Sequence, residues 1–207
     1  MKKPGDLHPS MEDLGRLNSQ DQVTHGYMPL YDALFQSIRF ERLNILEIGF
    51  SRGRGARTLA EYFYRSHVHS LELDYNDALK YYDNFPAALK ERVLLYQCDQ
   101  SDRDQLRHFL RRKNTGSFNL IIDDGSHDPA HQLCSFKVLW PALVPGGIYV
   151  IEDMHPYYNK GTHPTISHFT EQVHLMNKNG DIRNDKLETP DIEWIMFPYN
   201  RVVLRKR

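Results

Sequence analysis

The sequence predicts an α/β fold in which a doubly wound, mostly parallel sheet ends in an antiparallel hairpin. Short apolar runs of strand length recur along the chain, and stretches with apolar residues at helical spacing separate them. Two β-rich runs near the C-terminal end flank a short turn. The chain has 207 residues, which is enough for one such domain with a full hydrophobic core.

Strands and helices are predicted to alternate between residues 27 and 151. The strands are expected at residues 44–48, 68–73, 93–98, 118–122 and 148–151. Helices are expected at residues 27–38, 56–63, 78–85 and 128–143, and a further helix should begin at a capping sequence in residues 101–104. This alternation favours a parallel sheet, because parallel strands need long crossover connections.

The C-terminal part of the chain breaks this alternation. Residues 192–197 and 202–204 are β-rich, and Pro198–Arg201 between them is typical of a hairpin turn. With this hairpin the prediction becomes a seven-stranded, Rossmann-like sheet. Residues 157–190 are polar and contain glycine and proline, so we expect a partly helical insertion that covers the crevice of the sheet.

Composition bounds the domain organisation and the class of partner. Residues 1–22 are polar and lack periodicity, which predicts a flexible N-terminal arm before a single domain at residues 23–207. The 26 basic residues nearly balance the 27 acidic ones, so neither a nucleic acid nor a membrane is expected as a partner. Two cysteines, and no apolar run long enough to span a membrane, indicate free thiols in a cytoplasmic protein.

Two acidic clusters are the most informative feature of the sequence. Asp123-Asp124-Gly125-Ser126-His127 follows one predicted strand, and Glu152-Asp153 follows the next. Residues just past the carboxyl ends of parallel strands face the ligand crevice, so four carboxylates and a histidine should converge there. Carboxylates held together raise one another's pKa values, and a bound Mg²⁺, Mn²⁺ or Ca²⁺ would relieve this repulsion.

A glycine-rich turn, Leu46 to Gly55, follows the first predicted strand. Glycine there lets the backbone turn sharply and approach a ligand closely. The spacing departs from the dinucleotide-binding fingerprint. An acid two residues before the first glycine, with another glycine four residues after it, instead resembles the first motif of class I S-adenosylmethionine-dependent methyltransferases. The resemblance implies that the cofactor-binding residues of this turn are Glu47, Gly49, Ser51 and Gly53.

The ends of the next two predicted strands extend this resemblance. The second strand ends at Glu72 and Asp74, where the family places an acid that binds the ribose hydroxyls. Glu72 fits this role best, and Asp74 is the alternative. The third strand ends at Asp99 and Gln100, where the family places a polar residue that accepts a hydrogen bond from the adenine amino group.

Taken together, the motifs resemble those of the Mg²⁺-dependent macrolide deoxysugar O-methyltransferases of the mycinamicin and macrocin type. They are His25-Gly26-Tyr27 with Pro29-Leu30-Tyr31, Leu46-Glu47-Ile48-Gly49, Asp99-Gln100, Asp123-Asp124-Gly125-Ser126-His127, Pro145-Gly146-Gly147 and Ile151-Glu152-Asp153-Met154. The resemblance implies that Asp124, Glu152 and Asp153 bind Mg²⁺, for which Mn²⁺ is an alternative, and that His127 is the general base. Asp123 would orient His127, support the metal site or contact the methionine end of the cofactor.

The resemblance implies methyl transfer from S-adenosylmethionine to a hydroxyl of a sugar or glycosylated natural product. A divalent cation lowers the pKa of a bound oxygen, and a histidine, with an ordinary pKa of about 6.5, can take the proton. The expected partner is therefore a small-molecule acceptor, and a homo-oligomer is compatible with the sequence. The macrolide enzymes carry an additional N-terminal region, so we do not expect their acceptor pocket to transfer.

Several alternatives remain open on the sequence alone. A catechol-type O-methyltransferase uses a comparable metal arrangement, and clustered carboxylates also serve metal-dependent phosphoesterases. A cofactor-binding module without transfer activity, or a turn and a helix cap without metal, would fit the same residues. Around the acceptor, His155 is a candidate contact and the insertion offers Tyr157, Tyr158 and His163 as lining residues.

Overall fold

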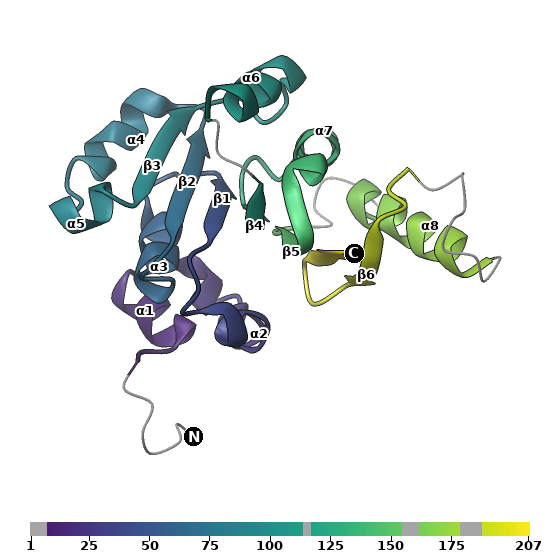
Figure 1. Ribbon diagram of the computed structural model, residues 1–207, viewed down its shortest axis with the longest axis horizontal. Helices are drawn as coiled ribbons and strands as arrows, with labels where there is room; N and C mark the ends of the chain where they lie inside the picture. The colour runs from purple at the N-terminus through teal and green to yellow at the C-terminus, as the bar shows by residue number, and fades with distance from the viewer. Residues whose placement is uncertain (1–7, 114–116, 155–161, 179–187) are drawn as a thin grey trace. The chain divides into compact units, whose positions relative to one another are not determined.

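The computed structural model describes residues 8–113, 117–154, 162–178 and 188–207. The chain divides into two compact units, Met1–Gln97 and Cys98–Arg207. The first unit holds strands β1 to β3, and the second holds strands β4 to β7 (Figure 1). All seven predicted strands are present, which confirms the α/β prediction.

The first unit is built on three parallel strands, β1 (Asn44–Ile48), β2 (His67–Glu72) and β3 (Val93–Gln97). They lie in the order β3-β2-β1, as Figure 1 shows. The last four residues of β1 are buried, as expected for a strand covered on both faces. The helices and 3₁₀ turns of this unit after the first helix are η1 (Asp21–Val23), α2 (Met28–Phe35), η2 (Gln36–Ile38), α3 (Arg54–Tyr62), α4 (Tyr75–Tyr82) and α5 (Ala87–Lys90).

The predicted N-terminal arm contains a helix, α1 (Met11–Leu17). Ser10 and Asp13 form a reciprocal capping box, and the side chains of Met11 and Leu14 are buried. The side chain of Asn18 also donates hydrogen bonds to Thr58 and Glu61 of α3. The expectation of an irregular arm up to residue 22 is therefore wrong for this stretch, because a capped helix with two buried side chains packs on the unit.

The second unit combines parallel and antiparallel pairing. Its strands are β4 (Phe118–Asp123), β5 (Leu143–Ile151), β6 (Ile192–Met196) and β7 (Val202–Lys206), in the order β4-β5-β7-β6. Strands β4 and β5 are parallel, whereas β7 pairs antiparallel with both β5 and β6, which confirms the C-terminal hairpin. The helices are α6 (Arg103–Lys113), α7 (Pro129–Leu139), η3 (Trp140–Ala142) and α8 (Pro164–Lys178).

The helix starts in this unit show which side chains act as caps. Asp128 caps α7 as predicted, since its side chain accepts from the amides of Ala130 and His131, and Pro129 follows it. At α6 the cap is Asp102, because its Oδ1 accepts from the amides of Asp104 and Gln105. The predicted capping sequence at residues 101–104 therefore does begin a helix, and Asp102 is its capping residue.

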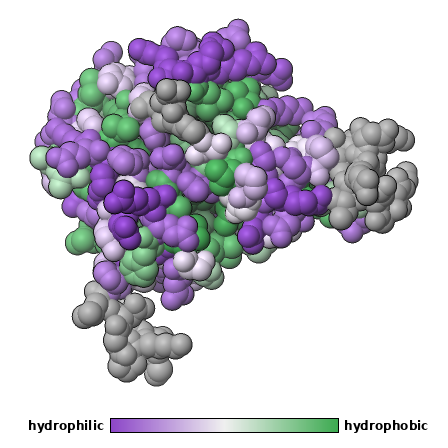
Figure 2. Space-filling view, viewed as in Figure 1, coloured by the Kyte–Doolittle hydropathy of each residue, from purple (hydrophilic) through white to green (hydrophobic). Residues whose placement is uncertain are grey.

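Hydrophilic side chains occupy much of the face shown in Figure 2, and hydrophobic ones lie in small groups among them. No helix in the described part of the chain is both long and apolar enough to cross a membrane. Both cysteines, Cys98 and Cys134, are free thiols, as predicted.

Candidate cofactor and metal sites

The glycine-rich turn of the first unit is fixed to the end of β2. The backbone passes through left-handed conformations at Gly49 (φ +94°), Ser51 (φ +49°) and Gly53 (φ +72°). The amide of Gly49 donates to the carbonyl of Leu71 at 2.9 Å, and the amide of Ser51 donates to Glu72 Oε2 at 2.7 Å. The turn and the carboxylate of Glu72 therefore form one hydrogen-bonded element.

Two glycines allow a close approach between this turn and its neighbours. A Cβ at Gly53 would lie 2.5 Å from the ring of Phe50, so its glycine is required by space as well as by backbone conformation. A Cβ at Gly55 would lie 2.2 Å from Glu47 Oε1. Glu47 is only 4% exposed, and its Oε2 accepts from the hydroxyl of Ser70 at 2.5 Å. Gly55 is thus a position of close approach to Glu47 that the sequence prediction did not select.

The structure separates the roles of the two acids at the end of β2 and just beyond it. Glu72 accepts the amides of Ser51 and Asp74, one on each carboxylate oxygen, which fixes its orientation. Asp74 is instead the N-cap of α4, since its Oδ1 accepts from the amide of Asp77 at 3.1 Å. Glu72 therefore suits the ribose-binding role better than Asp74 does.

In the second unit, the two candidates for the adenine contact, Asp99 and Gln100, also have different hydrogen-bond partners. Asp99 Oδ1 accepts from both the amide and the hydroxyl of Ser101, and its carboxylate is half-buried. Gln100 is 7% exposed, and its amide nitrogen donates to Asp123 Oδ1 at 3.0 Å. Its amide oxygen accepts from the backbone amide of Ser126 at 2.6 Å. Both ends of the Gln100 amide are therefore used in hydrogen bonds to Asp123 and Ser126. Asp99 is the better placed of the two to bind a ligand.

Asp123, the last residue of β4, is completely buried. Burial is the main cause that raises the pKa of its carboxyl to about 6, and hydrogen bonds from Ser135 and Gln100 partly offset it. Ser135 donates to Asp123 Oδ2 at 2.6 Å. Of the three predicted roles, this geometry favours that of a buried residue that supports the metal site.

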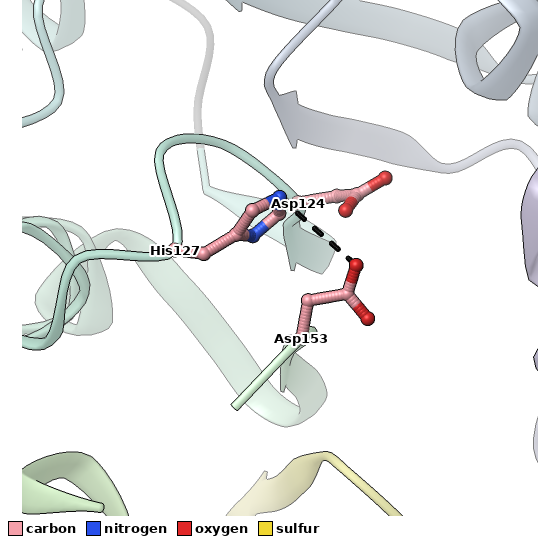
Figure 3. A group of neighbouring side chains, drawn as sticks. All are labelled: Asp124, His127 and Asp153. Atoms are coloured by element: carbon pink, nitrogen blue, oxygen red, sulfur yellow. Dashed lines mark ion pairs between the residues drawn. The ribbon is translucent and has the colours of Figure 1, made fainter. Parts of the chain in front are cut away.

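Asp124, His127 and Asp153 form a group that could hold a metal ion (Figure 3). Each offers one ligand atom, and these atoms all lie within 4.8 Å of one another. His127 Nε2 is 4.0 Å from Asp153 Oδ2, an ion pair when the histidine is protonated. The three side chains are half-buried, so water or a substrate can reach them. Two carboxylate oxygens and one imidazole nitrogen fit Mn²⁺ and, through the oxygens, Mg²⁺.

Glu152 lies outside this group. Its side chain is 1% exposed, its amide donates to the carbonyl of Asp123 at 2.9 Å, and its own carbonyl accepts from Gln132 at 3.0 Å. Both residues follow the end of β5, and Asp153 has a left-handed backbone (φ +55°), so the alternation of a strand does not set the directions of their side chains. The predicted ligation by Glu152 stays a prediction, and the geometric group contains His127 in its place.

The remaining predicted acceptor contacts fall in different places. His155, Tyr157 and Tyr158 lie outside the described residues. His163, just before α8, is 5% exposed. His131, although close in sequence to His127, contacts the hydroxyl of Ser126 through Nδ1 at 2.9 Å.

A model of a methyltransferase domain family matches residues 46–154, just over half of the chain. The chain belongs to this family. The match begins inside β1 and ends just after Asp153, so it contains every predicted cofactor-binding, metal-binding and catalytic residue, but none of the predicted acceptor contacts. The matched span also contains all three residues of the geometric group.

Relatives of this methyltransferase domain include two macrolide-sugar enzymes. Mycinamicin VI 2''-O-methyltransferase of Micromonospora griseorubida is 34% identical over 147 residues, which cover 66% of this chain and 33% of the relative. Demethylmacrocin O-methyltransferase of Streptomyces fradiae is 32% identical over 144 residues, which cover 66% of this chain and 34% of the relative. The chain thus spans about a third of the length of these relatives.

A solved structure extends the similarity to nearly the whole chain. It is the MycE methyltransferase of the mycinamycin biosynthetic pathway in complex with Mg, SAH and mycinamycin VI. The TM-score is 0.78 at 25% identity, and the match covers 98% of this chain and 56% of the other. This similarity confirms the predicted Rossmann-like methyltransferase fold.

Proposed function

We propose that this methyltransferase domain transfers a methyl group from S-adenosylmethionine to a hydroxyl of a sugar or glycosylated natural product, with the help of Mg²⁺ or Mn²⁺. The observation that carries the proposal is the Asp124, His127 and Asp153 group inside a domain of the methyltransferase family. The similarity to enzymes that act on macrolide sugars supports this acceptor class.

The first unit would bind the ribose of the cofactor. Glu72 is oriented by two backbone amides, and each carboxylate oxygen keeps accepting capacity for a ribose hydroxyl. The turn from Gly49 to Gly53 brings backbone close to the ligand, as a glycine-rich turn does in nucleotide sites. Glu47 would support this turn from below. In the second unit, Asp99 would accept from the adenine amino group.

The second unit would carry the reaction. Asp124 and Asp153 would hold the cation, and Glu152 remains a proposed third ligand. His127, the third member of the geometric group, would stay uncoordinated so that its imidazole can accept a proton. A bound divalent cation lowers the pKa of a coordinated hydroxyl and fixes its position. His127 would then take the acceptor proton as general base, because its Nε2 is 4.0 Å from Asp153 and so faces the same space. The acceptor oxygen would attack the methyl carbon opposite its bond to sulfur, so that an O–C bond forms as the C–S bond breaks and S-adenosylhomocysteine leaves. This requires the oxygen to be held at about 3 Å and in line with that bond.

The first test is calorimetric titration of S-adenosylhomocysteine into the purified protein, once with Mg²⁺ and once with EDTA. The proposal expects binding in both conditions, because the nucleoside residues lie apart in sequence from the acidic group. Absence of binding in both conditions would reject the cofactor assignment.

The second test is methyl transfer to a glycosylated macrolide, measured with labelled S-adenosylmethionine. Asp124→Asn should abolish metal-dependent turnover but leave S-adenosylhomocysteine affinity nearly unchanged. His127→Ala should lower turnover by about 10²–10⁴-fold if it is the general base. His131→Gln is the matched control, since His131 follows the same loop without joining the acidic group; near-normal turnover by His127→Ala would remove that residue from the mechanism.

A further inference from the structure

The backbone that carries Asp153 is held in an uncommon conformation. Asp153 has φ +55°, in the left-handed region that a residue with a side chain rarely adopts. The amide of Glu152 is fixed by the carbonyl of Asp123 at 2.9 Å, and the amide of Met154 donates to the carbonyl of Asn200 at 3.1 Å. A strained conformation of this kind persists only where its surroundings hold it.

A buried glutamine adds a restraint on this turn, beside the side chain of Asn200, which donates to Asp153 Oδ1 at 3.4 Å. Gln132, on α7, is 0% exposed, and its Nε2 donates to the carbonyl of Glu152 at 3.0 Å. That carbonyl belongs to the peptide group that joins Glu152 to Asp153. Its direction is therefore tied to the φ angle of Asp153, and so to where the Asp153 carboxylate points.

The other end of the Gln132 amide is fixed as well. Its Oε1 accepts from the hydroxyl of Thr165, at 2.9 Å, and Thr165 is also 0% exposed. These two bonds fix the orientation of the Gln132 amide. The carbonyl of Glu152 can only accept, so the amide nitrogen of Gln132 must face it. The amide oxygen of Gln132 then points toward Thr165, whose hydroxyl can donate. Thr165 is the second residue of α8, so the bonds run from α8 through α7 to the Asp153 turn.

We infer that Gln132 and Thr165 are positioning residues that set the metal-binding geometry of Asp153. The inference rests on the proposed function, in which Asp124 and Asp153 hold a divalent cation. Neither residue belongs to the geometric group, and both are sealed from solvent, so they act only through the peptide group of Glu152 and Asp153. A change in the position of α8 would break the Thr165 bond, release the Gln132 amide and lower metal affinity.

The experiment is Mn²⁺ binding to the full chain, followed by the electron paramagnetic resonance signal of free Mn²⁺. Gln132→Leu keeps a similar side-chain volume but removes both hydrogen bonds of the Gln132 amide. Thr165→Val removes only the hydrogen bond between Thr165 and Gln132. Outer partners of metal ligands are typically worth about 10–100-fold in affinity, and we expect losses in this range for Gln132→Leu and a smaller loss for Thr165→Val. S-Adenosylhomocysteine affinity should stay unchanged in both variants.

The control is Tyr82→Phe, which removes a hydrogen bond of 2.8 Å to the carbonyl of Val93 in the first unit. It should lower thermal stability like the test variants but leave Mn²⁺ affinity unchanged. If Gln132→Leu does not fold, Thr165→Val alone decides the question. Wild-type protein that fails to bind Mn²⁺ would reject the proposed metal site itself. Wild-type binding together with equal binding by the variants would overturn the positioning role alone.

Discussion

Gly55→Ala tests the close approach between α3 and Glu47. Helix propensity alone favours alanine over glycine by up to about 1 kcal/mol. The new Cβ would, however, lie 2.2 Å from Glu47 Oε1, so the carboxylate must move. Glu47 is 4% exposed and accepts from Ser70, and losing a hydrogen bond to a charged group costs about 1.5–3 kcal/mol. We therefore expect the free energy of unfolding to fall by about 1–2 kcal/mol.

The assay is urea denaturation followed by circular dichroism, with a thermal scan as a second measure. For a chain of this size each kcal/mol corresponds to about 2–4 °C, so the melting temperature should fall by a few degrees. Affinity for S-adenosylhomocysteine should fall in the same variant, because the displaced carboxylate lies beside the proposed nucleoside site. Helix propensity alone predicts instead that Gly55→Ala raises the free energy of unfolding.

Glu47→Asp provides the matched background. It withdraws the carboxylate by one methylene group, which removes the clash with a Cβ at Gly55. In that background Gly55→Ala should be neutral or stabilising by up to about 1 kcal/mol, so the two changes should be coupled by about 1–3 kcal/mol. Gly55→Ala that stabilises the protein with Glu47 in place, or additive effects in the cycle, would refute the reasoning.

Two further predictions concern single side chains. Glu72→Ala should weaken S-adenosylhomocysteine at least about 10-fold through lost hydrogen bonds to the ribose. Asp74→Ala should instead lower the free energy of unfolding by about 1 kcal/mol, because it removes the cap of α4, and it should leave S-adenosylhomocysteine affinity unchanged. Equal losses of affinity in Glu72→Ala and Asp74→Ala, measured by calorimetry, would contradict these separate roles. Cys98 is 3% exposed, and burial raises the pKa of its thiol to about 12, so iodoacetamide at pH 8 should label the half-buried Cys134 first. Mass spectrometry that finds Cys98 labelled at an equal rate in the folded protein would contradict that prediction.

The elements that the sequence predicted correctly are those with a local signal. Each parallel strand is a short apolar run, and the α7 cap at Asp128 and Pro129 is visible in two adjacent residues. Helix α1 was missed because it buries few side chains, although its Ser10 and Asp13 capping box was present in the sequence. A short helix with two buried side chains gives little periodicity to detect.

The parts of the site that sequence could not provide depend on contacts between distant residues. Gln132 reaches the carbonyl of Glu152 across 20 positions, and Thr165 reaches Gln132 across 33. A buried glutamine and threonine resemble any others in the sequence until the fold brings them together. The clustering of Asp124 with Asp153 was predictable from strand ends, whereas the separation of Glu152 from them depends on the backbone at Asp153.

Several residues with left-handed backbone lie at the proposed sites, namely Ser51, His127 and Asp153. Such conformations cost an L-residue about 1–2 kcal/mol, so this strain is expected where function requires a particular side-chain direction. Asp153→Gly should relieve the strain, and it also removes the repulsion between the Asp153 and Asp124 carboxylates. Without metal the variant should therefore be as stable as the wild type or more stable, but it should have lost Mn²⁺ binding.

Both effects of Asp153→Gly, on stability without metal and on Mn²⁺ binding, can be measured by thermal scans with and without Mn²⁺. A ligand at 100 times its Kd stabilises a protein by about 2.7 kcal/mol, which is about 5–11 °C for a chain of this size. Wild-type protein should show this shift and Asp153→Gly should not. Ser19→Gly is the control, because Ser19 also has a positive φ of 55° but lies outside the acidic group, so the shift should persist. An Asp153→Gly protein that keeps the full Mn²⁺ shift would show that the strain at Asp153 does not serve metal binding.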